Sequence, residues 1–124
     1  MSIYSLNAVS GTPIYRQIVD QTRQLVASGQ LPPGGHLPSV RAMAAELGIN
    51  PMTVSKAYSL LERDGIVARQ RGLGMVVLET TITPGEAIRP QAVALIEAAL
   101  RLRLTREEVA RAIDLAWTQD KEPL

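Results

Sequence analysis

The sequence predicts a mainly α-helical fold: an N-terminal winged helix-turn-helix, made of three helices and a β-hairpin, followed by two further helices. Two observations predict it. Residues 37–58 contain two short helical patterns joined by a single glycine, and residues 66–78 contain two strand-like runs around a glycine-rich loop. We expect two parts, a winged helix at residues 1–78 and a linker with two helices at residues 79–124.

The first helix is predicted to begin after Thr12, whose side chain would cap it, with Pro13 in its first turn. From Tyr15 to Val26, apolar residues recur at spacings of three and four, which is typical of a helix with one buried stripe. Gly29 is expected to end this helix. The Pro-Pro-Gly-Gly stretch that follows is predicted to be irregular, since it favours neither helix nor strand.

The second and third helices form the predicted helix-turn-helix. Ser39 is expected to cap the second helix, and Asn50, followed by Pro51, begins the third. Gly48 is predicted to end the second helix, where the chain reverses. A helix commonly ends on a residue in the left-handed region, and glycine adopts this conformation without steric cost. Small Ala44 allows the two helices to approach closely. The other inward-facing residues are Met43, Leu47, Ile49, Val54 and Ala57.

After the third helix, the runs 66–69 and 75–78 read as the two strands of a hairpin with a tight, glycine-containing loop. Two helical patterns complete the chain. One runs from Pro90 to about Arg103, and the other opens with a capping box formed by Thr105 and Glu108.

The two C-terminal helices carry more apolar surface than one neighbour can cover. A two-helix unit of this size would bury too little to fold alone. We therefore expect it to complete its core against a second copy in a homodimer, the alternative being that both helices pack onto the winged helix of their own chain. The residues expected at the dimer interface are Val93, Ile96, Leu100, Val109, Ile113 and Trp117.

Composition argues against several classes of protein. The chain has no cysteine and a single histidine, His36, and no paired carboxylates at catalytic spacing, so we expect neither an enzyme nor a metal or cofactor site. No apolar stretch approaches the ~20 residues that span a membrane, and no secretion signal is recognisable, which predicts a cytoplasmic protein. Residues 13–78 carry seven basic and four acidic side chains, which places any polyanionic partner on the winged helix.

Six short motifs fall within residues 12–78. They are Pro13-Ile14-Tyr15, Leu31-Pro32-Pro33-Gly34, Leu37-Pro38-Ser39-Val40-Arg41, Thr53-Val54, Ala57-Tyr58 and Gly72-Leu73-Gly74. This set resembles the GntR superfamily of bacterial transcription regulators. The short remainder, 46 residues, resembles the YtrA-like branch with its two C-terminal dimerisation helices. The resemblance implies a dimeric repressor that binds double-stranded DNA, often at a transporter operon that includes its own gene.

In such a protein the third helix faces the major groove and the hairpin, or wing, enters the neighbouring minor groove. Side chains of the third helix that point away from Val54 and Leu61 are presented to DNA, and Arg71 lies at the wing tip, where Gly72 lets the backbone come close. The residues expected to contact DNA are Ser39, Arg41, Asn50, Met52, Thr53, Ser55, Lys56, Ser59, Arg69, Arg71 and Gly72.

Several roles stay open at this point. Lys56 is suited to a guanine edge or to a phosphate, and Asn50 to capping alone or to DNA as well. Arg41 is suited either to a phosphate contact or to an ion pair with Glu46. Where many relatives have arginine or a polar residue, this chain has Pro51 and Met52, so sequence preference would lean on a Met52 contact with a thymine methyl and on DNA shape. A winged helix that binds only protein is the second function to consider.

Overall fold

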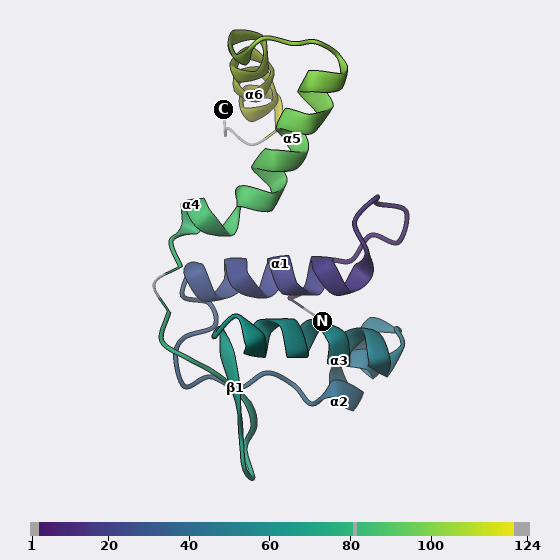
Figure 1. Cartoon of the computed structure of the whole chain (residues 1–124), viewed down its shortest axis with the longest axis vertical. Coiled ribbons are helices and arrows are strands. Elements are labelled where there is room, and N and C mark those ends of the chain that lie inside the picture. The colour runs from purple at the N-terminus through teal and green to yellow at the C-terminus, as the bar shows by residue number, and fades with distance from the viewer. Residues whose placement is uncertain (1–2, 81, 121–124) are drawn as a thin grey trace. The chain divides into compact units, whose positions relative to one another are not determined.

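The computed structural model describes residues 3–80 and 82–120 and has two compact units, Met1–Ile88 and Arg89–Leu124 (Figure 1). It confirms the predicted fold class, a winged helix-turn-helix followed by C-terminal helices. The elements are α1 (Ile14–Ala27), α2 (Val40–Leu47), α3 (Pro51–Arg63), β1 (Val67–Gln70), β2 (Gly74–Val77), α4 (Pro84–Ala87), α5 (Arg89–Arg101) and α6 (Arg106–Asp120).

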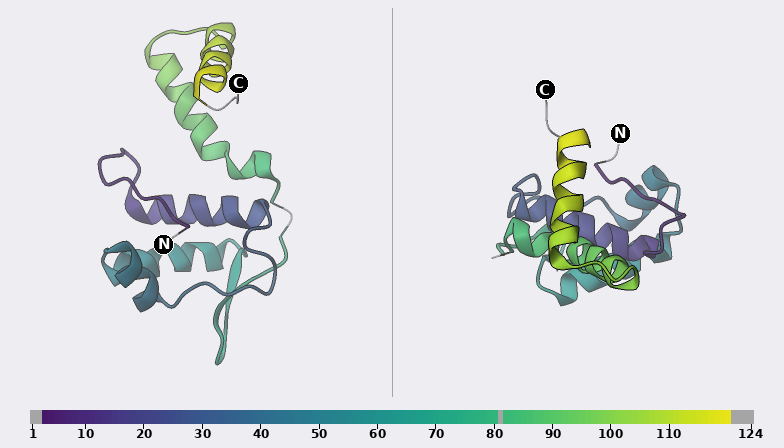
Figure 2. Two further views of the ribbon diagram at one scale, coloured as in Figure 1. Left: turned by 180° about the vertical axis from the view of Figure 1, so that it is seen from behind. Right: turned by 90° about the horizontal axis from the view of Figure 1, so that it is seen from above.

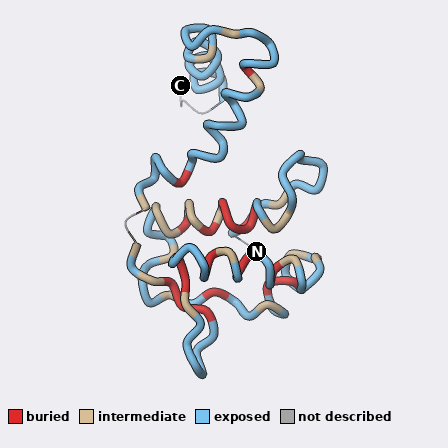
Figure 3. The backbone as a smooth tube through the Cα atoms, viewed as in Figure 1, coloured by how far each residue is buried: buried red, intermediate tan, exposed pale blue. Residues whose placement is uncertain are grey.

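The first unit is built around the packing of α1 and α2 on α3. Ile18 of α1 and both Val54 and Leu61 of α3 are completely buried, and Met43 of α2 is 1% exposed. In Figure 3 the buried positions follow the inner sides of α1 and α3 and continue into the hairpin. One continuous core therefore fixes the orientation of α3.

The turn between α2 and α3 forms as the sequence predicts. Gly48 ends α2 in the left-handed region, at φ 67°. The Ser39 hydroxyl accepts a hydrogen bond from the Ala42 N–H at 3.0 Å, and the Asn50 side-chain oxygen accepts one from the Met52 N–H at 2.8 Å. Both predicted N-caps are confirmed, so the ends of the two helices are defined by local chemistry.

The hairpin projects from the three-helix body (Figures 1 and 2). Its strands pair antiparallel with Val67 opposite Val77, and the chain turns between Gln70 and Gly74. The other edge of β2 also pairs: the Leu37 N–H donates to the Met75 carbonyl at 3.0 Å. This pairing by the stretch that follows the irregular prolines and glycines was not predicted from the sequence. The pairing anchors the base of the wing.

The beginning of α1 differs from the prediction. Thr12 does not cap the helix: the N-cap position is Pro13, and no side chain caps it. Gln17 holds this end instead, since its side-chain amide donates to the carbonyls of Asn7 and Thr12 at 2.9 and 2.8 Å. The Tyr4 hydroxyl and the Thr22 hydroxyl hydrogen-bond at 2.7 Å. The segment before the helix thus packs along α1 and is tied to it by the side chains of Gln17 and Thr22, while the helix start keeps no side-chain cap.

The first unit also extends beyond the boundary predicted at residue 78. Ile82 packs against the core, and the short helix α4 contacts α1. The Thr83 hydroxyl caps α4 by accepting a hydrogen bond from the Glu86 N–H at 3.2 Å, and Ala87 is 2% exposed. The sequence predicts turns here instead of a helix, because four residues are too few to show a helical period.

The second unit, α5 and α6, has almost no core of its own. Ala99 is its one buried residue among those described. Helix α5 starts at Arg89 and ends at Arg101, close to the predicted limits. The capping box is confirmed, because Thr105 and Glu108 exchange hydrogen bonds between backbone N–H and side-chain oxygen at 3.0 and 3.1 Å.

Asp20 is a buried carboxyl on α1, 6% exposed. Burial raises its pKa above 3.8 against the attraction of Arg16 and Arg23. The folded state therefore holds this proton more tightly than the unfolded state, so stability is lost as pH rises from about 3.8 through the folded-state pKa. We expect Asp20→Asn to raise the Tm at neutral pH and to leave it nearly unchanged near pH 3. Thermal unfolding of both proteins at the two pH values tests this. A lower Tm for the variant at neutral pH would contradict it.

Candidate nucleic-acid interface

Helix α3 has one buried and one exposed face. Val54, Ala57, Tyr58 and Leu61 form the buried face. On the opposite face Met52 is 77% exposed, and Ser55, Lys56 and Ser59 are also exposed, as predicted, while Thr53 is half-buried at the flank. A largely polar helix face on a rigid body is what a recognition helix requires.

Tyr58 of α3 is hydrogen-bonded to the segment just before α2. Its hydroxyl donates to the Pro38 carbonyl at 2.7 Å and also lies 3.5 Å from the Met43 sulfur. Burial, with smaller contributions from Tyr4 and Glu46, raises the pKa of Tyr58 well above its ordinary value, so the phenol keeps its proton and remains a donor. The two helices of the motif are joined in this way next to Ser39.

The residues at the start of α2 and those of the wing line a common hollow. Ser39 and Arg69 line one hollow of about 250 Å³, with Tyr58 and Met75. Arg41 is exposed in the first turn of α2. Within the part of the chain that the structure describes, Arg41 forms no ion pair with Glu46, because the two ion pairs there join Arg23 and Arg63 to Asp64.

The wing tip presents Arg71 and Gly72, both exposed. Gly72 has φ 79°, a conformation that favours glycine, and the Leu73 N–H closes the turn onto the Gln70 carbonyl at 2.9 Å. The His36 ring nitrogen Nδ1 lies 3.2 Å from the Leu73 carbonyl. The only histidine therefore supports the wing.

Lys56 lies differently from the simple prediction. Its Nζ is 4.0 Å from the centroid of the Tyr15 ring on α1, and the Arg16 guanidinium carbon is 5.6 Å from the same centroid. The ammonium is thus held toward α1 instead of extending from the middle of the exposed face. From the sequence, Tyr15 was expected in the buried stripe and in a family motif, and Arg16 was not singled out. No local pattern reports a contact between residues 41 positions apart.

Two of the predicted DNA contacts already have structural partners. The side-chain oxygens of Ser39 and Asn50 both accept the capping hydrogen bonds described above. Capping is therefore a confirmed role for both residues. A DNA contact by either remains a prediction, and it would have to coexist with the cap.

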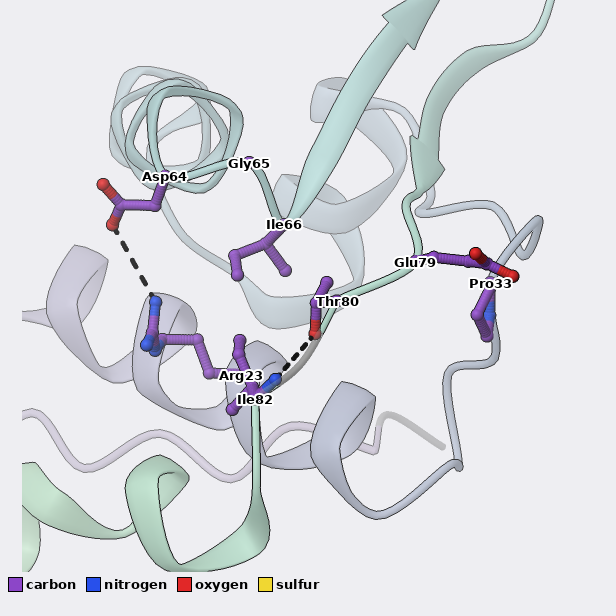
Figure 4. Close-up of a pocket in the computed structure, with 8 residues that line it drawn as sticks. All are labelled: Arg23, Pro33, Asp64, Gly65, Ile66, Glu79, Thr80 and Ile82. Carbon is purple, nitrogen blue, oxygen red and sulfur yellow. Dashed lines mark hydrogen bonds and ion pairs between the residues drawn. The ribbon is translucent and has the colours of Figure 1, made fainter.

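A pocket of about 680 Å³ lies on the first unit, lined by Arg23, Pro33, Asp64, Gly65, Ile66, Glu79, Thr80 and Ile82 (Figure 4). Arg23 and Asp64 approach to 3.9 Å across one end. The Glu79 carboxylate points away from them, toward Pro33, and the Thr80 hydroxyl accepts a hydrogen bond from the Ile82 N–H at 3.2 Å. The polar groups do not converge on one ligand position, so we assign no effector to this pocket.

The sequence of residues 14–77, which runs from α1 to β2 and makes up more than half of the chain, matches a known family: bacterial regulatory proteins, gntR family. The chain belongs to the GntR family. It is a DNA-binding transcription regulator with a winged helix-turn-helix, and the predicted resemblance is confirmed.

Relatives of this GntR-family protein include short regulators. HTH-type transcriptional repressor YtrA of Bacillus subtilis (strain 168) is 48% identical over 80 residues, 62% of either chain. The HTH-type transcriptional regulator YhcF of the same organism is 37% identical over 108 residues, 84% of this chain and 89% of YhcF. The match thus spans less than two thirds of YtrA but most of YhcF.

Among solved structures, YtrA from Sulfolobus acidocaldarius, a GntR-family transcription factor, is 39% identical with a TM-score of 0.61, covering 81% of this chain and 99% of that one. Within residues 3–80 and 82–120, every helix of this GntR-family chain is too short or too polar to span a lipid bilayer. The same residues contain no group of three or more metal-ligating side chains placed to hold an ion.

Proposed function

We propose that this GntR-family protein is a dimeric, sequence-specific repressor in the cytoplasm that binds an inverted repeat, with α3 in the major groove and the wing in the minor groove. The observation that carries the proposal is the exposed face of α3, which the buried core and Tyr58 hold rigidly. The name of the Bacillus relative, a transcriptional repressor, supports the direction of regulation. We further propose that the protein represses a transporter-type operon that includes its own gene.

Roles follow from the positions of the side chains. Met52, Ser55 and Ser59 lie where base edges would be read. Arg41 and Arg69 are suited to phosphates, and Thr53 to a phosphate through its hydroxyl. Arg71 and Gly72 would enter the minor groove. In the proposed complex, Ser39 and Asn50 act indirectly, because they cap and so define the starts of α2 and α3.

The dimer is proposed from α5 and α6. The two helices line an apolar groove of about 620 Å³ that includes Ile96, Leu100, Val109 and Ile113. In the single chain Ile96 is 53%, Leu100 66% and Trp117 62% exposed, and Val93 is 39% exposed. Apolar side chains gathered in one place and left in water are typical of a protein interface. A second copy placed on this surface would cover it and bring two copies of α3 to one duplex.

Selection of binding sites from random duplexes tests the proposed function. We expect enrichment of two half-sites in inverted orientation at a fixed spacing, because a two-fold symmetric dimer imposes its symmetry on the site. The upstream region of the gene should contain this site. The alternative, a winged helix that binds only protein, predicts no enriched sequence and no binding to any duplex at about 50 mM salt.

The wing gives a second test. Replacing Arg71 with alanine is expected to weaken binding and to lower the slope of log K against log salt by about 0.9 for each subunit on the DNA, because a complex without this cation in the minor groove releases fewer counterions when it forms. Titrations of the selected duplex at several salt concentrations measure this slope. Arg111→Ala, an equal charge change at an exposed position of α6, is the control. An unchanged slope for Arg71→Ala would mean that the wing stays off the duplex.

A further inference from the structure

Two cations from different helices meet on one aromatic ring beside α3. Lys56 Nζ of α3 lies 4.0 Å from the centroid of the Tyr15 ring, and the Arg16 guanidinium carbon lies 5.6 Å from it. Tyr15 is half-buried and packs against the core, whereas Arg16 and Lys56 are exposed. The Tyr15 ring, fixed by the core, thus lies beside two positive charges that face solvent.

This pair of charges is not neutralised by ion pairs. Neither Arg16 nor Lys56 forms one within the described residues, where the ion pairs belong to Arg23, Arg63 and Asp64. The nearby carboxyl of Asp20 attracts Arg16, and this lowers the Asp20 pKa against the larger effect of burial. Two like charges at one ring repel each other, and a bound anion would relieve that repulsion.

The ring also determines where Lys56 presents its charge. A lysine side chain has a flexible four-carbon stem and loses conformational entropy when a contact fixes it. A cation–π contact with Tyr15 fixes the ammonium before any ligand arrives, which lowers the cost of binding. The ammonium is then on the α1 side of α3, away from the centre of the exposed face. Phosphates lie along the rim of the major groove and base edges on its floor, so this position favours a phosphate.

We propose that Arg16 and Lys56, held on the Tyr15 ring, form a binding site for a backbone phosphate of duplex DNA. Tyr15 is a positioning residue in this site. The inference rests on the proposed DNA binding and extends the contact surface to α1. Lys56 then contributes affinity and register, and sequence discrimination is left to other residues of α3.

Salt titrations of the full chain test the site, with the selected duplex and a random-sequence duplex of equal length as probes. Lys56→Met keeps the apolar stem without the charge, and Arg16→Ala removes the other cation. Because the two cations share one phosphate, the double variant is expected to lower the salt slope by about 0.9 per bound subunit and each single variant by a part of this. All three variants should weaken binding to both duplexes by the same factor. Arg111→Ala should leave the slope nearly as it is. An unchanged slope for the double variant, or a loss confined to the selected duplex, would overturn the proposal.

The role of Tyr15 is tested by its coupling to the two cations. From the usual strength of an exposed cation–π contact, Tyr15→Leu should weaken binding about two- to fivefold per subunit, and Tyr15→Phe, which keeps a ring, should bind nearly as the parent does. In the Arg16→Ala, Lys56→Met background, Tyr15→Leu should have no further effect. An equal loss in that background would mean that Tyr15 acts only through the fold, and would overturn its assignment.

Different results would contradict the proposed DNA binding and the proposed phosphate site. A parent protein that binds neither duplex at about 50 mM salt would remove the proposed function and this site with it. A parent protein that binds, with variants whose slopes do not change, would remove only the phosphate site. Thermal unfolding of each variant shows whether a loss of binding comes from a loss of folded protein.

Discussion

Replacing Ile113 with aspartate is expected to convert a dimer into a monomer and to weaken binding to the selected duplex by at least about 100-fold. Ile113 lies in the apolar groove between α5 and α6 and is 46% exposed in the single chain. If a second copy covers this groove, the substitution places an unpaired charge in the interface, which costs several kcal/mol. Each 1.4 kcal/mol corresponds to a tenfold change in affinity. Light scattering at micromolar concentration measures the mass, and a salt-matched titration measures the binding.

Gln119→Asp is the matched control for this prediction. It introduces the same charge on the same helix at an exposed position away from the groove. We expect Gln119→Asp to remain a dimer. A monomer mass for the unsubstituted protein would contradict the proposed dimer directly. It would favour the alternative in which the C-terminal helices are covered by their own chain.

The second large effect is expected from Leu61→Ala. Leu61 is completely buried on α3, and removing its side chain leaves a cavity in the core that holds this helix. Such substitutions cost about 2–5 kcal/mol, a large part of the stability of a small domain. We expect the Tm to fall by at least about 10 °C, measured by circular dichroism.

Met52→Ala separates stability from recognition on the same helix. Met52 is 77% exposed, so its truncation should leave the Tm within about 2 °C of the parent. If Met52 contacts a thymine methyl, the same variant should bind the selected duplex less well and the random duplex equally well. A large fall in the Tm of Met52→Ala would show that the exposed face of α3 has a structural role.

Much of the first unit was predictable because its determinants are local. Ser39, Asn50 and Gly48 each act within a few residues of their own position: two side chains satisfy free N–H groups, and one glycine adopts a left-handed turn. The exposed face of α3 followed from helical periodicity in the same way. The predictions that failed or were missing are of another kind, because they depend on contacts between distant segments or on elements too short to show a period.

Three details show this difference. Gln17, not Thr12, secures the start of α1, since the preceding segment folds back along the helix. The pairing of Leu37 with Met75 joins stretches separated by two helices. The contact between Tyr15 and Lys56 forms only because α1 packs against α3, and it is the basis for proposing the phosphate, one of the two roles expected of Lys56.

By itself, the sequence determined the order of the main helices and the hairpin, the ends of α2 and α3 and the face that α3 exposes, because spacing and capping operate over a few residues. The tertiary structure alone decided where Lys56 holds its charge, how the wing is anchored, and that α4 belongs to the first unit. The physical reason is that a core fixes the distances between segments far apart in the chain, and those distances have no signature in a local pattern.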